Sequence, residues 1–411
     1  MKIAIFTYYL NDDKVGKANY GGVLQAYALQ HYLDLCSHEA VQIKYRDSIG
    51  KCSISKTELF KLKCREIGFP GAVIRAVFTL LSKVKRKAHN TVMHWLEKVF
   101  GIDKLIAIRR ECVIRFNEEI TKHSEKTYGA KDLDKINGFD VYIAGSDQLW
   151  HYLNRYSSLD PGYFLTFVKR PAKKISYAAS MAMPVIPDWA KEKVFKALEG
   201  FEAISVREKS DKDNLEKIMQ GKPIEWVLDP TLLLKAEDWN SIAANNKYAE
   251  RKYIFTYILG DNKKQRKCVE RFAKENGLEI VNIPYLLNHY RSCDRRFGDI
   301  RISSVSPELW ISLIRDAEYI FTDSFHGSVF SIHYHKKFYT FKRNSDNNEL
   351  SMNSRVYSLF SLFDIQDRLI SADMSPEEIS AIPDIDYDKV EEILARERKH
   401  SSDFLLNAIN S

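Results

Sequence analysis

Closely spaced cysteines are missing from this sequence, whose six cysteines are scattered at positions 36, 52, 64, 112, 268 and 293. This scatter argues against a thiolate metal site and suits a reducing compartment, so we expect a cytoplasmic protein. No apolar run reaches the roughly 20 residues that a membrane span needs. The apolar N-terminal stretch ends at "NDDK" after one strand, which is unlike a secretion signal.

Familiar catalytic motifs are missing as well. The sequence contains no Walker phosphate loop, no HExxH metal helix and no GxSxG nucleophile elbow. Nothing in it marks a metal site. We therefore expect chemistry that needs no metal.

Outside one segment, the positive and negative charges of the chain nearly cancel. The net charge is +7, but residues 51–100 hold 11 Lys and Arg against 3 Glu and no Asp, a balance of +8 that leaves −1 elsewhere. Basicity confined to one segment excludes a uniform basic tract for nucleic acid, and no nucleic-acid partner is expected.

The basic segment also repeats apolar residues at helical spacing. These are Val73, Ile74, Val77, Phe78, Leu81 and Val84, with Arg75, Lys83, Lys85, Arg86 and Lys87 among them. A basic amphipathic helix can lie on an anionic membrane surface, which would make the protein peripheral at the inner face of the membrane. The alternative is a solvated helix packed on its own domain.

Two series of alternating strands and helices follow one another along the 411 residues. The first occupies residues 1–245 and contains the basic helical insertion, at about 56–122. The second occupies residues 246–411 and ends in helices. Each series predicts a doubly wound, Rossmann-like α/β domain with a parallel sheet. Ligands bind such sheets at the carboxyl ends of the strands, so the site is expected in a cleft between the two domains.

A pair of glycines opens the first helix, in "ANYGGVLQAYALQHYL" at residues 18–33. Gly21 and Gly22 lie where the loop becomes the helix, and an anion can approach unpaired amides at such a point. The alternative is a helix entry that needs glycine only for packing. The full dinucleotide-binding fingerprint is absent.

The segment "TDSFHGSVF" places Ser324 at a strand end, His326 at the turn, and Gly327 and Ser328 at a helix start. A histidine there can act as a general acid or base. It can also be a buried histidine bonded to a carbonyl. Arg207 ends another strand in "SVRE" and could hold a carboxylate or phosphate. A structural pair with Glu208 or Asp229 is the alternative.

A polar turn follows the strand in "AGSDQLW". Ser146, Asp147 and Gln148 suit sugar hydroxyls, and Trp150 could offer a stacking face. An ordinary Asx turn is the alternative. Asp229, in "DPT", is typical of a turn rather than of a catalytic group.

Seven segments together resemble one family, the polysaccharide pyruvyl transferases. In order they are "NYGGVLQAYALQ", "AGSDQLW", "SYAAS", "ISVREKSD", "VLDPTLLL", "TDSFHGSVFSI" and "NSRVYSLFSLFDIQDRL". The resemblance implies a GT-B-like arrangement of the two domains. It also implies transfer of a carboxyvinyl or pyruvyl group from phosphoenolpyruvate, as a co-substrate with no further cofactor, to sugar hydroxyls of a surface polysaccharide or its lipid-linked precursor.

The resemblance also implies roles for individual residues. His326 would protonate the donor, and Asp147 is the second candidate catalytic residue. The donor-binding candidates are Arg207, Ser324, Gly327, Ser328 and Arg355, and the acceptor-binding candidates are Gly21, Gly22, Ser146, Gln148 and Trp150.

One position departs from the family pattern. Pyruvylating members carry an arginine two positions before the histidine, where this chain has Ser324. Arg355, Lys342 or Arg343 could replace that cation. Two other functions stay open: a glycosyltransferase of the same fold that uses a nucleotide sugar, and a non-catalytic member that binds a glycan.

Overall fold

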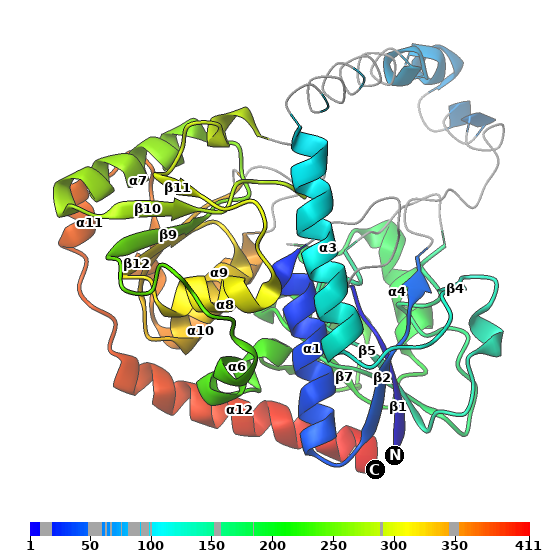
Figure 1. Cartoon of the computed structure of the whole chain (residues 1–411). Helices are drawn as coiled ribbons and strands as arrows, with labels where there is room; N and C mark the ends of the chain where they lie inside the picture. The colour runs from blue at the N-terminus through cyan, green and yellow to red at the C-terminus, as the bar shows by residue number, and fades with distance from the viewer. Residues whose placement is uncertain are drawn as a thin grey trace.

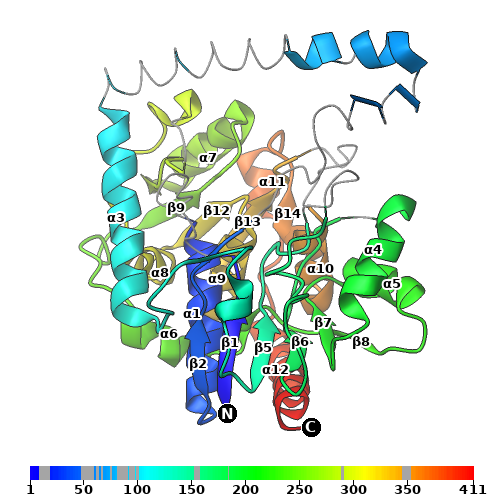
Figure 2. The same cartoon turned by 90° about the vertical axis from the view of Figure 1, so that its right-hand side faces the viewer.

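The computed structural model describes residues 1–8, 19–47, 60–61, 64–65, 68–74, 76–80, 91, 98, 101–151, 158–183, 185–287, 291–344 and 353–411. Figures 1 and 2 show two α/β halves with helix α1 (Tyr20–Leu35) between them and with the two chain ends close together. Among the described residues, no helix combines the length and the apolar character that crossing a membrane requires.

The N-terminal half is built on a four-stranded parallel sheet in the order β2-β1-β5-β6. The strands are β1 (Lys2–Phe6), β2 (Glu39–Gln42), β5 (Val141–Ala144) and β6 (Lys173–Ser176). Two short parallel pairs are β3 (Tyr45–Arg46) with β4 (Tyr128–Gly129), and β7 (Ile204–Val206) with β8 (Ile224–Trp226). The helical elements are α4 (Asp188–Leu198), α5 (Lys209–Ile218), and the 3-10 turns η1 (Leu133–Lys135) and η2 (Pro230–Leu232).

The C-terminal half holds a six-stranded parallel sheet in the order β11-β10-β9-β12-β13-β14. Its strands are β9 (Tyr253–Tyr257), β10 (Glu279–Asn282), β11 (Ile300–Arg301), β12 (Tyr319–Thr322), β13 (Lys337–Phe341) and β14 (Leu369–Ile370). Its helical elements are α6 (Ala236–Ile242), α7 (Lys263–Asn276), α8 (Pro307–Arg315), α9 (Phe325–His333), α10 (Ser354–Phe363), α11 (Pro376–Ser380), η3 (Ser292–Asp294) and η4 (Gln366–Arg368).

The predicted fold class, two Rossmann-like α/β units with parallel sheets, is confirmed. In the C-terminal sheet the strand order reverses between β9 and β12, and ligands bind α/β sheets at such a switch point. Local signals account for individual elements. Asn262 caps the start of α7 through its side chain, and Gly277 ends this helix with a left-handed φ of 62°.

Helix α1 connects the two halves because it is apolar on nearly every side. Tyr20, Val23 and Leu24 pack into the core of the C-terminal half, whereas Leu29 and Leu33 pack on the N-terminal sheet. The Tyr20 hydroxyl donates to the carbonyl of Val305 at 2.9 Å. Burial of a whole helix between two sheets explains why its sequence shows no polar face.

Two helices do not follow the predicted domain boundaries. Helix α3 (Ile102–Ile120) falls within the expected insertion, yet it packs against α1 and α8. Its Arg109 donates hydrogen bonds to carbonyls of the C-terminal half, those of Pro284, Ile302 and Ser303. The insertion therefore ends earlier than expected, and α3 belongs to the core.

Helix α12 (Tyr387–Asn410) was expected to stay within the C-terminal domain. Instead it runs beneath both halves, as Figure 1 shows in red. Leu405 and Ile409 pack with Ile3 and Ile5 of β1, and the Lys173 ammonium donates to the Ile409 carbonyl at 2.9 Å. The last helix thus returns to the N-terminal half, and residues 246–411 are not one separate unit.

Candidate active site

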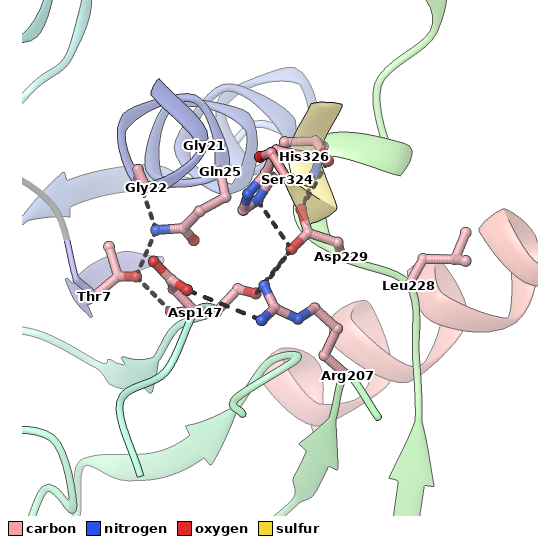
Figure 3. Close-up of polar contacts among 12 residues, drawn as sticks. Thr7, Gly21, Gly22, Gln25, Asp147, Arg207, Leu228, Asp229, Ser324 and His326 are labelled. Carbon is pink, nitrogen blue, oxygen red and sulfur yellow. Dashed lines mark hydrogen bonds and ion pairs between the residues drawn. The ribbon is translucent and has the colours of Figure 1, made fainter. Parts of the chain in front are cut away.

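The ends of strands from both halves meet at a group of charged side chains, which Figure 3 shows. We call Asp147, Arg207, Glu208, Asp229 and His326 the carboxylate cluster. All five are buried. Asp147 follows β5, Arg207 and Glu208 follow β7, Asp229 follows β8, and His326 lies in the first turn of α9. The cluster therefore occupies the carboxyl edge of both sheets, where the sequence placed the site.

His326 is held between the two halves. The N-cap of its helix is Ser324, whose side-chain oxygen accepts from the amide of Gly327 at 3.3 Å. One side of the imidazole lies on the backbone of Gly21, where an added Cβ would meet Nδ1 at 2.0 Å. The other ring nitrogen, Nε2, lies 3.6 Å from Asp229 Oδ2. Gly21 is thus a glycine because the imidazole occupies the space of a side chain.

Asp229 is the centre of the cluster. Its Oδ1 accepts from the amide of Thr231 at 3.0 Å and from the Thr231 hydroxyl at 2.7 Å. Its Oδ2 accepts from Arg207 Nη1 at 2.8 Å and from the Ser146 hydroxyl at 3.2 Å. Burial alone would raise the pKa of this carboxyl, but His326 and Arg207 outweigh burial and hold the pKa well below its usual range. Asp229 is therefore ionised.

Arg207 is only 4% exposed and is largely neutralised. Its Nε donates to Glu208 at 2.9 Å, its Nη1 donates to Asp229, and its Nη2 lies 3.9 Å from Asp147 Oδ1. Burial opposes the charge of Arg207, but Glu208, Asp229 and Asp147 outweigh it and raise its pKa above the usual value. Both structural pairs that the sequence offered as alternatives are therefore present.

A second carboxyl lies behind Glu208. Asp211 accepts from the amides of Met181 and Ala182 through Oδ2. Burial, and next the neighbouring Glu208 carboxylate, raise the pKa of Asp211 well above its usual value. Among the described residues, neither Asp211 Oδ1 nor Glu208 Oε2 receives a hydrogen bond. A proton on Asp211 can donate to Glu208, and this bond satisfies both oxygens.

Asp147 has a left-handed backbone. Its φ is +70°, an uncommon value that Asp adopts more readily than most L residues do. The adjoining Ser146 is fully buried and bonded to Asp229, so it lies inside the cluster rather than at an acceptor surface. Gly22 has a steric role here, since an added Cβ would lie 3.1 Å from the carbonyl oxygen of Tyr8 and 3.5 Å from Asp147 Oδ2.

Beside the cluster lies a second basic region, which we call the arginine pocket. It is lined by Asp323, Phe325, Phe341, Lys342, Arg343, Asn344, Asn353, Arg355, Val356, Tyr357 and Leu369. Its enclosed volume is about 10 Å³, room for about one water. Among the described residues that line it, three are cations and one is a carboxylate, so the ligand that suits this lining is an anion.

Arg355 is the most deeply placed cation of the arginine pocket, at 9% exposure. Burial, followed by the neighbouring Arg207 and Arg343, lowers its pKa to about 10. With its amide oxygen turned toward the guanidinium, Gln148 accepts from Arg355 Nη1 at 2.8 Å and from Nη2 at 3.3 Å. Gln148 therefore links the two halves instead of standing free for a sugar.

Arg343 is tied to the strand end that carries Ser324. Its Nη2 donates to the carbonyl of Asp323 at 2.8 Å and lies 3.3 Å from Asp323 Oδ1. The same carboxylate accepts from the amides of Leu259 and Gly260, across the switch point between β9 and β12. A cation thus lies next to Ser324, the position where pyruvylating relatives have arginine.

Phe325 separates the carboxylate cluster from the arginine pocket. Its ring centroid lies 4.6 Å from Arg207 Cζ, 6.0 Å from Arg355 Cζ and 5.1 Å from the centroid of the His326 ring. Both guanidiniums are therefore within cation–π range of one ring. The sequence analysis did not single out Phe325, because an apolar residue before a helical histidine resembles any core position.

Three predicted binding residues have structural roles instead. Trp150 is fully buried, stacks on Phe164 and donates to the Tyr163 carbonyl, so it has no open face for a sugar. Ser328 is fully buried and bonded to Ser324 and Thr340.

Gly327 is the third of these residues. Its amide is taken by Ser324, and its missing Cβ would lie 2.6 Å from Thr322 Oγ1. Gly327 is therefore needed where α9 approaches β12.

The sequence analysis also missed the central role of Asp229. The "DPT" segment does form the expected turn, because Asp229 caps η2. The same carboxylate reaches residues 22 and 97 positions away in the sequence, Arg207 and His326. No local signal reveals such partners. Among the described residues, no group of three His, Cys, Asp or Glu side chains could hold a metal ion.

Comparisons with known proteins identify one family. The sequence profile described as "Polysaccharide pyruvyl transferase" matches residues 19–345, more than three quarters of the chain. No curated protein matches the sequence.

Solved structures of similar shape include enzymes that handle sugar nucleotides. UDP-GlcNAc 2-epimerase from Methanocaldococcus jannaschii has 10% identity and a TM-score of 0.48, covering 96% of this chain and 92% of that one. The S. aureus MnaA–UDP co-structure has 10% identity and a TM-score of 0.48, covering 100% and 98%. The glycosyltransferase SnogD from Streptomyces nogalater has 9% identity and a TM-score of 0.39, covering 98% and 96%.

Proposed function

The chain belongs to the polysaccharide pyruvyl transferase family and is a transferase, and from this premise we propose that it moves a pyruvyl group from phosphoenolpyruvate onto sugar hydroxyls. The acceptor is a surface polysaccharide or its lipid-linked precursor. One observation carries the proposal. Family segments far apart in the sequence supply Gly21, Asp147, Arg207, Asp229 and His326 to a single buried cluster.

The donor requires cations, because phosphoenolpyruvate carries a phosphate and a carboxylate on three carbons. Arg207 is a poor partner for a further anion, since Glu208 and Asp229 already bond to it. Arg355 is the better one, because it is buried beside two other arginines and its pKa is lowered. We assign the main anionic contact of the donor to Arg355, with Arg343 and Lys342 beside it, in place of the arginine that Ser324 replaces.

The binding of the donor requires the arginine pocket to widen. Tyr357 and Lys342 lie on its rim, where the Lys342 ammonium is 5.4 Å from the Tyr357 ring centroid. Tyr357 is 36% exposed, so its side chain can turn outward without leaving a cavity in the core. Outward rotation of these two side chains would open the pocket from the solvent side.

His326 supplies the proton in the proposed reaction. The imidazolium, stabilised by ionised Asp229, protonates the methylene carbon of the donor. One sugar hydroxyl attacks the central carbon and loses its proton. The phosphate then leaves that carbon as a second hydroxyl of the same sugar bonds to it, and the proton of this hydroxyl passes to the departing phosphate. The products are a cyclic pyruvate ketal and inorganic phosphate.

Asp147 is the candidate base for the attacking hydroxyl. Its carboxylate lies between Gly22 and Arg207, and a left-handed backbone at a residue other than glycine is of the kind found at functional positions. A base on the N-terminal half and an acid on the C-terminal half would bring acceptor and donor together at the cluster.

The test is phosphate release from phosphoenolpyruvate in the presence of candidate glycan acceptors. His326→Asn should fold normally and lose about 10²–10⁴-fold of the turnover. His335→Asn is a matched control, because His335 is exposed and pairs with Glu391 on the surface. Turnover of the His326 variant within twofold of wild type would refute its role. A thermal shift with UDP-GlcNAc and none with phosphoenolpyruvate would favour a nucleotide-sugar transferase instead.

A further inference from the structure

Large apolar side chains are exposed together on the described part of the insertion. Residues 68–74 and 76–80 are helical and stand away from the two sheets in both views (Figures 1 and 2). Phe69 is 65% exposed, Phe78 69% and Leu80 62%. Val73, Ile74 and Val77 are exposed as well. Elsewhere among the described residues, exposed large apolar side chains lie singly. We call these six residues the apolar face.

The apolar face answers a question that the sequence left open. The spacing at residues 73, 74, 77 and 78 suited either a helix packed on its own domain or a helix with an outside partner. Exposure of all four side chains excludes the packed alternative for these residues. Clustered apolar surface of this kind marks an interaction site.

Charge indicates which partner covers this face. Residues 51–100 carry the +8 balance of the sequence, and the rest of the chain is close to neutral. Leu81, Val84, Arg75, Lys83, Lys85, Arg86 and Lys87 contribute to the pattern but lie outside the described residues. Apolar residues next to a concentration of Lys and Arg match a surface that is apolar inside and anionic at its edge. An anionic lipid bilayer has that structure.

We propose that the apolar face docks the protein onto the surface of an anionic lipid bilayer. The apolar side chains enter the boundary between head groups and acyl chains, and the neighbouring cations contact the head groups. The attachment is peripheral. It does not depend on the reaction proposed above, since the face lies outside the carboxylate cluster and the arginine pocket.

The test is co-sedimentation of the full chain with vesicles. One set is phosphatidylcholine alone, and the other contains about one quarter phosphatidylglycerol to supply anionic head groups. Binding is expected only to the anionic set at about 0.1 M salt, and it should fall at least about tenfold at about 1 M salt, where screening shortens the Debye length from about 10 Å to about 3 Å.

Two variants separate the apolar and ionic contributions. Phe69→Ser/Phe78→Ser removes exposed apolar area and should lower binding at least about tenfold. The charge reversal of Lys83, Lys85, Arg86 and Lys87 to Glu should abolish binding to the anionic set. Phe195→Ser is the matched control, because Phe195 is an exposed phenylalanine on α4, outside this segment, and its loss should change nothing.

Three results would overturn the proposal. The first is equal recovery in the supernatant with both vesicle sets at low salt. The second is unchanged binding of the Phe69→Ser/Phe78→Ser variant when its thermal unfolding matches wild type. The third is a dimer in sedimentation equilibrium that this variant dissociates, because the apolar face would then be covered by a second copy of the chain.

Discussion

Two buried arginines, 4% and 9% exposed, face opposite electrostatic surroundings on the two sides of Phe325. Arg207 lies among Glu208, Asp229 and Asp147, which raise its pKa. Arg355 lies beside Arg207 and Arg343, and its pKa is lowered to about 10. Carboxylates therefore surround Arg207, whereas cations outnumber carboxylates in the described lining of the arginine pocket.

This difference predicts separate roles for the carboxylate cluster and the arginine pocket. An arginine that neighbouring carboxylates already hold is fixed in place and has little affinity left for an added anion. A group of neighbouring cations becomes more stable when an anion enters. We therefore expect the carboxylate cluster to orient His326 and Asp147, and the arginine pocket to bind the donor. Variants of the carboxylate cluster and of the arginine pocket can test these roles separately.

The largest effect is expected when a carboxylate of the cluster is removed. Asp229→Asn takes from buried Arg207 one of the two carboxylates bonded to it, and breaking a buried ion pair costs about 3–5 kcal/mol. Urea denaturation should show a loss of unfolding free energy in that range. Arg251→Gln, which breaks the exposed pair with Glu279, should leave the unfolding midpoint unchanged. Equal midpoints for Asp229→Asn and wild type would contradict the account.

The second effect tests geometry rather than charge. Gly21→Ala places a Cβ 2.0 Å from His326 Nδ1, so the imidazole has to leave its position beside Asp229. Turnover should fall at least about 10²-fold, the lower end of a general acid contribution. Gly129→Ala is the control, because its Cβ would meet only ordinary contacts, at 3.7 Å from Asp132.

A double variant identifies the cause of that loss. Gly21→Ala/His326→Ala removes the clash together with the ring, so stability should return while turnover stays low. If the double variant is as unstable as Gly21→Ala alone, the glycine serves some contact other than His326.

Much of the fold could be predicted from the sequence. Strands such as β9 and β12 are buried on both faces, so they read as apolar runs that end in polar or glycine-containing loops. Helices α3 and α12 could not be assigned to a domain. Their apolar faces pack on elements that are distant in the sequence. An amphipathic pattern shows which face of a helix is buried, but it does not show which element covers that face.

The sequence predicted where the candidate site lies in the fold better than it predicted the role of each residue in the site. His326 and Arg207 follow strands, which is a local signal, and both of them contact Asp229. The sequence also offered Trp150 as one possible stacking face, but the same pattern of polar turn and aromatic residue describes a core tryptophan. The sequence around Asp229 predicts a turn, and the structure has that turn. Its role as the centre of the cluster depends on Arg207 and His326, which are distant in the sequence and come close only in the folded protein.

The third prediction concerns the shared proton behind Arg207. The pKa of Asp211 is raised on folding, so the stability it contributes is complete below its unfolded value of about 4 and is lost as pH rises toward its folded value. Asp211→Asn keeps a donor to Glu208 and removes this dependence. Relative to wild type, the variant should therefore gain at least about 1.4 kcal/mol between pH 4 and pH 8, the value of one pKa unit.

Unfolding midpoints of the two proteins across that pH range provide the measurement. Ser210→Ala is a suitable control, since Ser210 neighbours Asp211 but carries no titrating group. Parallel pH profiles for wild type and Asp211→Asn would show that no proton is held between the two carboxyls.

The most direct test of the central claim is calorimetric titration of phosphoenolpyruvate into wild type and Arg355→Gln. The variant keeps a polar side chain beside Gln148 but removes the most deeply buried cation of the arginine pocket. We predict that wild type binds the donor and that Arg355→Gln raises the Kd at least about tenfold, or about 1.4 kcal/mol, with little change in unfolding free energy. A Kd within twofold of wild type, or no binding of phosphoenolpyruvate by wild type, would contradict the account.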